Sequence, residues 1–169
     1  MKGGIAMLHD EWKLIYDTYK KPLYLYALSL SGNTQDAEDL LQETFVKAFL
    51  SYKNTGSIKC WLITVLRNEF YNLQRKRKKE ILDDVSNLLI DKMTSEDMLS
   101  NLIEKEERLH LFREIQKLPF QMRAILIESV YFQLKDNEIS EMHGITSENV
   151  RKIRSRAKQK LIDKMKEGK

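Results

Sequence analysis

The residues best suited to chemistry in this chain lie between Trp61 and Lys79, and the chemistry is binding. Placed on an α-helix, this stretch turns its apolar residues to one side: Leu62, Leu66, Phe70 and Leu73. The other side combines flat rings, amides and cations: Trp61, Thr64, Asn68, Tyr71, Asn72 and Arg75, followed by a cationic run to Lys79. Rings stack on exposed bases and cations bind the adjacent phosphates, so this face suits a single nucleic-acid strand. The alternative is an aromatic pair packed against a neighbouring helix, with the cations in solvent.

A second stretch, residues 134–161, has the pattern of a helix-turn-helix. A short helix would begin near Leu134, Gly144 permits a tight turn, and Thr146 or Ser147 would cap the next helix. The buried stripe of that helix would be Val150, Ile153, Ala157 and Leu161. Its other side offers groups suited to base edges in the major groove and to flanking phosphates: Glu148, Arg151, Lys152, Ser155 and Arg156. Helix-turn-helices also occur in proteins that bind no DNA, but the cationic bias favours DNA.

No enzyme active site is visible in the sequence, and we expect no cofactor and no metal. The three histidines, His9, His110 and His143, share no ligand spacing with Cys60, and each suits a surface or packing role. A glycine-rich phosphate loop and a nucleophile elbow are both missing. We interpret Cys60 as a small residue at the edge of a core rather than as a reactive thiol.

We expect helices to carry all of these residues. Hydrophobic residues make up 42% of the chain and charged residues 32%, with only two Pro and six Gly and no recurring strand-like alternation. We therefore predict an all-α protein of two small helical domains, residues 8–80 and 105–167, joined by an acidic linker at 81–104. In the second domain we expect a helix from Leu102 to Leu118, and a further helix with Pro119 at its first position.

Charge is unevenly distributed along the chain. Residues 67–79 hold six Lys or Arg against one Glu, residues 81–107 hold eight acids against two Lys, and residues 147–169 hold nine Lys or Arg against three acids. Two basic ends around an acidic connector predict two contacts with a polyanion. Cys60 is the sole cysteine, and no apolar run is long enough for a membrane span or a signal peptide, so we expect a cytoplasmic protein. Met7 is a candidate for the natural start, because the preceding Lys-Gly-Gly is what a purine-rich ribosome-binding site would encode.

In the N-terminal part, the sequence predicts helices that pack beside the helix with the Trp61 face. Residues 8–30 would form one or two helices with Pro22 at a start or kink, and residues 31–34 a turn capped by Asn33 or Thr34. Residues 36–52 would form a helix that buries Ala37, Leu40, Leu41, Thr44, Phe45 and Ala48. Its outward face carries Asp39, Gln42, Glu43, Val46 and Leu50, a mixed patch that suits a protein partner or is ordinary surface scatter.

The run Asp36-Ala37-Glu38-Asp39-Leu40-Leu41-Gln42-Glu43-Thr44-Phe45, then Trp61-Leu62, Arg67-Asn68 and a basic run, resembles the second conserved region of extracytoplasmic-function (ECF) sigma factors. The resemblance implies that this protein binds core RNA polymerase and directs promoter-specific transcription initiation. It implies β′-clamp contacts by Asp39, Gln42, Glu43 and Val46. It also implies that a loop around an extruded base and the following helix melt and hold the −10 element, through Asn54, Ser57, Trp61, Asn68, Asn72, Arg75 and Arg77.

Residues from about Leu109 to Lys166 resemble the fourth sigma region, which reads the −35 element and contacts the β flap. The resemblance implies −35 contacts by Glu148, Asn149, Arg151, Lys152, Ser155 and Arg156, and an anti-sigma factor as a further partner. The chain departs from the family pattern at several positions. Asn72 replaces an Asp, Thr64 an Arg, and Arg154 an aliphatic residue. Lys135 stands where Ser or Thr commonly caps, so we expect Asp136 to cap instead.

One alternative function is a dimeric helix-turn-helix regulator that acts without polymerase. In that case the Trp61 face would be buried between protomers, whereas a sigma factor would keep it open for single-stranded DNA.

Overall fold

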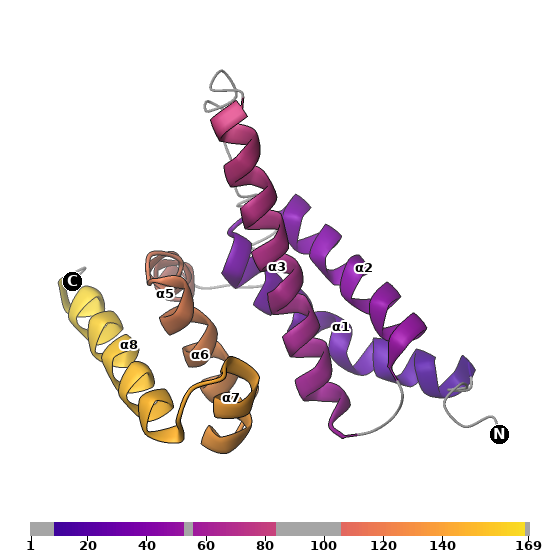
Figure 1. The fold of residues 1–169 in the computed structure, drawn as a ribbon. Coiled ribbons are helices and arrows are strands. Elements are labelled where there is room, and N and C mark those ends of the chain that lie inside the picture. The colour runs from indigo at the N-terminus through magenta and orange to yellow at the C-terminus, as the bar shows by residue number, and fades with distance from the viewer. Residues whose placement is uncertain (1–8, 53–55, 84–105, 168–169) are drawn as a thin grey trace. The chain divides into compact units, whose positions relative to one another are not determined.

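The computed structural model describes residues 9–52, 56–83 and 106–167, and every regular element in these ranges is an α-helix (Figure 1). The chain divides into two compact units, Met1–Thr94 and Ser95–Lys169. The predicted all-α class with two helical bodies is therefore confirmed. Met7, Asn54, Leu102 and almost all of the predicted linker lie outside the described residues, so the exact domain boundaries remain predictions. The helices are α1 (His9–Ser31), α2 (Thr34–Ser51), α3 (Ile58–Asp83), α5 (Glu106–Gln116), α6 (Phe120–Val130), α7 (Asp136–His143) and α8 (Ser147–Glu167).

In the N-terminal unit, α1 is one continuous helix and passes through Pro22 without ending. Proline removes one backbone hydrogen bond from a helix, and burial of the following side chains, Leu23, Tyr26, Ala27, Leu28 and Leu30, holds the helix together. Gly32 takes a left-handed φ of 69°, which ends α1. Asn33, not Thr34, is the N-cap of α2, because its side chain accepts a hydrogen bond from the Asp36 backbone N–H at 3.0 Å.

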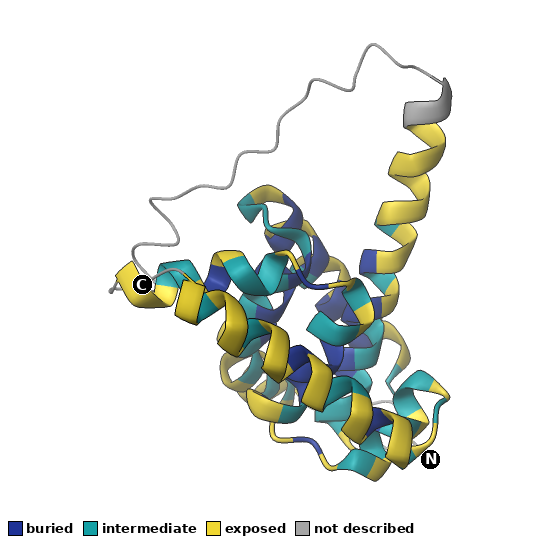
Figure 2. Ribbon diagram, turned by 90° about the vertical axis from the view of Figure 1, so that its left-hand side faces the viewer, coloured by how far each residue is buried: buried dark blue, intermediate teal, exposed yellow. Residues whose placement is uncertain are grey.

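The cores of α2 and α3 follow the predicted stripes with small differences. Five of the six predicted α2 positions are buried, and Leu41 is only half-buried. On α3 the expected Leu62, Leu66 and Phe70 are buried, whereas the expected Leu73 is only half-buried. Ile63 and Arg67 are buried in addition. Figure 2 shows that the burial is confined to the first turns of α3, while its later turns are exposed. This free half of α3 leaves the basic run open to solvent.

The C-terminal unit is built around α6, whose residues Ala124, Ile125, Leu126, Ile127 and Glu128 are all buried. The stripe of α8 packs against it, with Val150 and Ala157 buried and Ile153 half-buried. Gly144 ends α7 with a φ of 68°, and Thr146 caps α8 by accepting from the Asn149 backbone N–H at 3.1 Å. The helix-turn-helix pattern of the sequence is thus present, with α7 and α8 as its two helices.

Three local predictions in this unit were wrong. The α5 helix ends at Gln116 rather than at Leu118, and Pro119 is the N-cap of α6 rather than its first helical residue. Asp136 does not cap α7. Lys135 holds the N-cap position in extended backbone, its N–H donates to Glu138 Oε1 at 2.8 Å, and Asp136 is the first helical residue. The Asp136 carboxylate is instead engaged by Arg154 of α8.

Candidate nucleic-acid interface

The outer face of α3 gathers four of its side chains around one open surface pocket, lined by Asn68, Tyr71, Asn72 and Arg75. The Arg75 Nη2 donates a hydrogen bond to Asn72 Oδ1 at 2.5 Å, which orients both polar groups. Three predicted −10 residues therefore meet at one place. Tyr71 was placed on this face by the helical pattern but was left out of the predicted contacts, although its exposed ring has the chemistry of a stacking surface.

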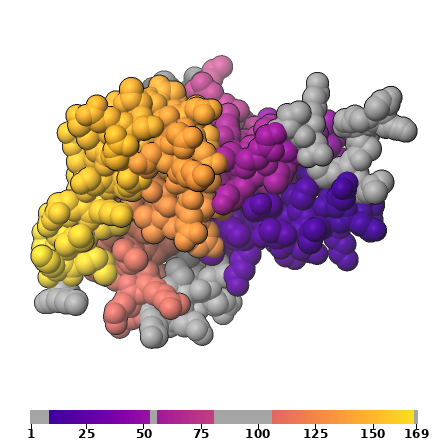
Figure 3. Space-filling model, turned by 90° about the horizontal axis from the view of Figure 1, so that it is seen from below, coloured from indigo at the N-terminus to yellow at the C-terminus, as the bar shows by residue number. Residues whose placement is uncertain are grey.

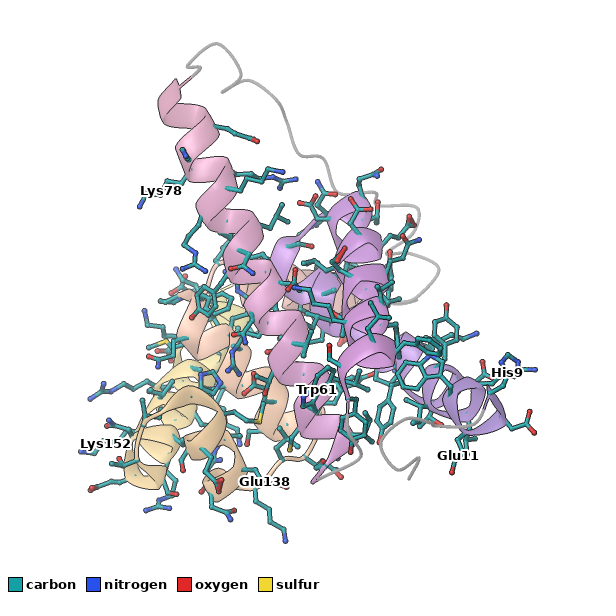
Figure 4. All side chains as sticks on the ribbon, turned by 45° about the vertical axis from the view of Figure 1, so that its right-hand side comes forward. His9, Glu11, Trp61, Lys78, Glu138 and Lys152 are labelled. Atoms are coloured by element: carbon teal, nitrogen blue, oxygen red, sulfur yellow. The ribbon has the colours of Figure 1, made fainter. Side chains whose placement is uncertain are left out.

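Trp61 lies in the first turn of α3, well before this pocket along the helix (Figure 4). Its half-buried ring meets Tyr52 edge to face, with the ring centroids 5.5 Å apart at 64°. The Tyr52 hydroxyl donates to the Gly56 carbonyl at 3.0 Å. Ser57, another predicted −10 residue, accepts from the Cys60 backbone N–H at 3.2 Å and so caps α3. Tyr52 was not predicted as a site residue, because its contact with Trp61 spans the loop between α2 and α3.

Arg77, also predicted to contact the −10 strand, forms a two-bond ion pair within the unit. Its Nη1 and Nη2 donate to the Asp36 carboxylate at 2.5 and 2.7 Å. The Asp36 side chain is 8% exposed and that of Arg77 is 47% exposed. The hydrogen bond to Asp36 raises the pKa of Arg77, so the guanidinium keeps its charge at neutral pH. A DNA contact by Arg77 remains a prediction, and a DNA phosphate would compete with the Asp36 carboxylate for the Arg77 guanidinium.

The predicted polymerase-contacting residues of α2 are all exposed. Asp39, Gln42 and Glu43 share a groove with Lys76 and Arg77 of α3. Val46 lies outside this groove, among the exposed apolar side chains Phe49 and Leu50. Lys47 pairs with Glu69 and ties α2 to α3 beside the groove. The α2 surface therefore offers an acidic part and an apolar part to a partner.

On α8 all six predicted −35 residues are exposed: Glu148, Asn149, Arg151, Lys152, Ser155 and Arg156. In Figure 4, Lys152 projects away from the body of the unit, and Figure 3 shows the side chains of α7 and α8 (orange to yellow) as one continuous surface. Lys152 Nζ is 4.0 Å from Glu148 one turn earlier, a weak exposed pair that a phosphate could replace. The N-terminal turns of a helix in this position are those that reach base edges.

Two polar links inside the C-terminal unit were not predicted. His143 Nε2 of α7 lies 2.7 Å from Glu128 Oε1 of α6, and both side chains are buried. Arg154 of α8 bonds Ser129 and Asp136, and the hydrogen bond from Arg154 lowers the pKa of Asp136. Arg154 was recognised as a departure from the aliphatic pattern, but its partners could not be identified from the sequence. They explain how a cation is accommodated beside the buried stripe.

Within the described ranges, no three His, Cys, Asp or Glu side chains are placed to hold a metal ion. None of the helices in those ranges combines the length and apolarity needed to cross a membrane.

Comparison with known proteins identifies both parts of the chain. The family model for Sigma-70 region 2 matches residues 15–80, and that for Sigma-70, region 4 matches residues 109–161. The ECF RNA polymerase sigma factor SigM of Bacillus subtilis is 33% identical over 150 residues, which cover 87% of this chain and 90% of SigM. SigE of Mycolicibacterium smegmatis is 30% identical over 156 residues, which cover 90% of this chain and 60% of that protein.

The fold itself matches a solved structure, the sigma factor RpoE in complex with the anti-sigma factor NepR from Bartonella quintana. The TM-score is 0.78 at 24% identity, over 93% of this chain and 98% of that chain. The alternative of a dimeric regulator that acts without polymerase finds no support in these relatives. Since both sigma regions are matched in order and SigM is aligned along nine-tenths of its length, the chain belongs to the ECF RNA polymerase sigma factors, which direct promoter-specific transcription initiation.

Proposed function

We propose that the N-terminal unit of this sigma factor binds core polymerase through α2 and holds the melted −10 strand along α3, while α8 reads the −35 element. The observation that carries the proposal is the α3 pocket, where an aromatic ring, two amides and a guanidinium converge on an exposed face that ends in a basic run. A buried or purely structural helix face would not gather these groups at one exposed place.

The energetics agree with strand capture rather than active unwinding. Extruding a base costs a few kcal/mol, and stacking on an aromatic side chain returns about 1–3 kcal/mol per base. Trp61 and Tyr71 are ten residues apart on one helix, which is about 15 Å along its axis. They can therefore serve different nucleotides of the same strand, and the exposed cations that follow can hold its phosphates. No nucleotide hydrolysis is needed, and we assign the chain no catalytic role of its own.

The decisive experiment reconstitutes the full chain with core polymerase and measures two quantities, affinity for core and yield of open complex on a promoter. Trp61→Ala should lower open-complex formation by about 5- to 150-fold, the loss of one stacked base, while leaving core affinity within about threefold. Trp61→Phe keeps a ring and should recover most of the activity. Equal loss of both quantities in Trp61→Ala would mean that Trp61 only supports the fold. Specific duplex binding by the protein alone at physiological salt would point to the regulator instead.

We further propose that the α2 groove and its apolar neighbours meet the β′ clamp, that the C-terminal unit meets the β flap, and that the protein works in the cytoplasm. In the solved structure of RpoE from Bartonella quintana, the bound partner is the anti-sigma factor NepR. An anti-sigma factor is accordingly the partner we propose for the resting state, where it would cover the surfaces that polymerase uses.

A further inference from the structure

Asp136 stands at the centre of polar contacts that join three helices of the C-terminal unit, α6, α7 and α8. The Arg154 guanidinium of α8 donates to Ser129 Oγ of α6 at 3.0 Å and to both carboxylate oxygens of Asp136 at the start of α7. A second guanidinium, that of Arg151, lies 3.6 Å from Asp136 Oδ2. One carboxylate of α7 thus faces two cations that are one turn apart on α8.

The two cations are placed differently. The Arg154 side chain is 21% exposed and fixed by three hydrogen bonds, so it anchors Asp136. The Arg151 side chain is 57% exposed, and its contact with Asp136 is longer than a hydrogen bond. The other donor groups of Arg151 can therefore face a ligand while Asp136 stays where Arg154 holds it.

A carboxylate at this distance changes what Arg151 can bind. It restrains a long side chain that would otherwise lose rotamer freedom on binding, and this preorganisation favours two-point recognition. Its negative charge also repels a phosphate that approaches the same guanidinium, whereas it does not repel a neutral base edge. Since the contact to Asp136 uses Nη1, it does not occupy the Nε–Nη2 edge, which matches the O6 and N7 acceptors of guanine.

We propose that Asp136 is a positioning residue for promoter reading, which directs Arg151 to a guanine of the upstream element rather than to a phosphate. The proposal rests on the proposed function, in which α8 enters the major groove. It assigns a specificity role to a residue of α7, outside the recognition helix. Arg154, which replaces the aliphatic residue usual in the family, is then the group that keeps Asp136 in place.

The test uses the full chain with core polymerase and a promoter library in which every upstream position carries each of the four bases. The wild-type protein should prefer guanine at one position by about 5- to 150-fold, the range for a two-bond arginine contact. Asp136→Asn and Arg151→Ala should each reduce that preference to less than about threefold, and the double variant should reduce it no further. Glu141→Gln makes the same charge change on an exposed position of α7 and should leave the preference intact.

Each outcome decides a separate point. A role for Asp136 in folding alone would lower activity on all promoters equally and leave the base preference unchanged in Asp136→Asn, which would overturn the proposal. If Asp136→Asn fails to fold by circular dichroism, Asp136→Glu takes its place, because it keeps the negative charge and moves the carboxylate relative to Arg151, and an unchanged guanine preference in that variant refutes the idea. A wild-type protein with no upstream preference would instead remove the proposed −35 role of α8 itself.

Discussion

Replacing Arg77 by Ala should destabilise the N-terminal unit, although Arg77 lies in a basic run that resembles a DNA-binding surface. The substitution removes two hydrogen bonds from Asp36, whose carboxylate is 8% exposed and cannot be fully rehydrated in place. Hydrogen bonds to a charged group contribute about 1.5–3 kcal/mol. Because Arg77 itself is half-exposed, solvent screening reduces this value, and we expect a loss of about 1–2 kcal/mol in the free energy of unfolding.

Arg75→Ala is the matched control. Arg75 is two residues earlier in the same run, is also exposed, and bonds only Asn72 on its own helix among the contacts described above. Its removal should change stability by no more than about 0.5 kcal/mol. Both variants lose one positive charge, so general charge effects on the unit are the same in the pair, and the difference between them isolates the contact with Asp36.

Urea unfolding followed by tryptophan fluorescence is the appropriate assay, because both tryptophans, Trp12 and Trp61, belong to the N-terminal unit. With a urea dependence of about 1 kcal/mol per M for a unit of this size, Arg77→Ala should unfold at a urea concentration about 1–2 M lower than the wild-type protein. Equal midpoints for the Arg77 and Arg75 variants would refute the reasoning. Arg77 would then be available to DNA, as the sequence pattern predicts.

Two further predictions concern the helix-turn-helix. His143→Phe removes one polar partner of the buried Glu128 carboxylate and should lower the free energy of unfolding of the C-terminal unit by about 2–3 kcal/mol. The amide NMR signals of α7 during urea unfolding measure this change. A change below about 1 kcal/mol would mean that the pair is not a structural link. Gly144→Ala should cost about 1–2 kcal/mol in the same assay, because an added Cβ meets no neighbour and only the left-handed φ of 68° opposes it. Gly144→Asn should cost less, and equal losses in the two variants would contradict this account.

The parts of the fold that follow from the sequence are those governed by local rules. Helical periodicity gives the buried stripes of α2, α3 and α8, and the left-handed preference of glycine gives the turns at Gly32 and Gly144. Pro22 shows the limit of such rules. The sequence allows a helix start or a kink there, and the structure excludes the start, because the packing of the following turns outweighs the loss of one hydrogen bond and α1 continues.

The candidate site is predictable in type and less so in detail. Asn68, Asn72 and Arg75 meet because they share one helix face, and spacing alone shows this. The acidic partners of Arg77 and Arg154 lie 41 and 18 residues away, on other helices, and no periodic signal connects them. Asp136 shows the same limit, since its position before a helix suggests a cap, whereas a cation from α8 determines what its carboxylate does.

These internal pairs also limit the number of cations on α3 that we expect to bind phosphates of a DNA strand. Residues 67–79 contain six Lys or Arg, but Arg67 is buried and Arg77 is held by Asp36. Four exposed cations remain for phosphates: Arg75, Lys76, Lys78 and Lys79. Counterion release contributes about 0.7 to the salt exponent for each phosphate neutralised on a single strand, so this helix accounts for an exponent of about 3 rather than about 4. The number of cations in a run is therefore larger than the number of expected phosphate contacts wherever an acid on a neighbouring helix pairs with one of them. In this chain Asp36 pairs with Arg77, and Asp136 pairs with Arg154.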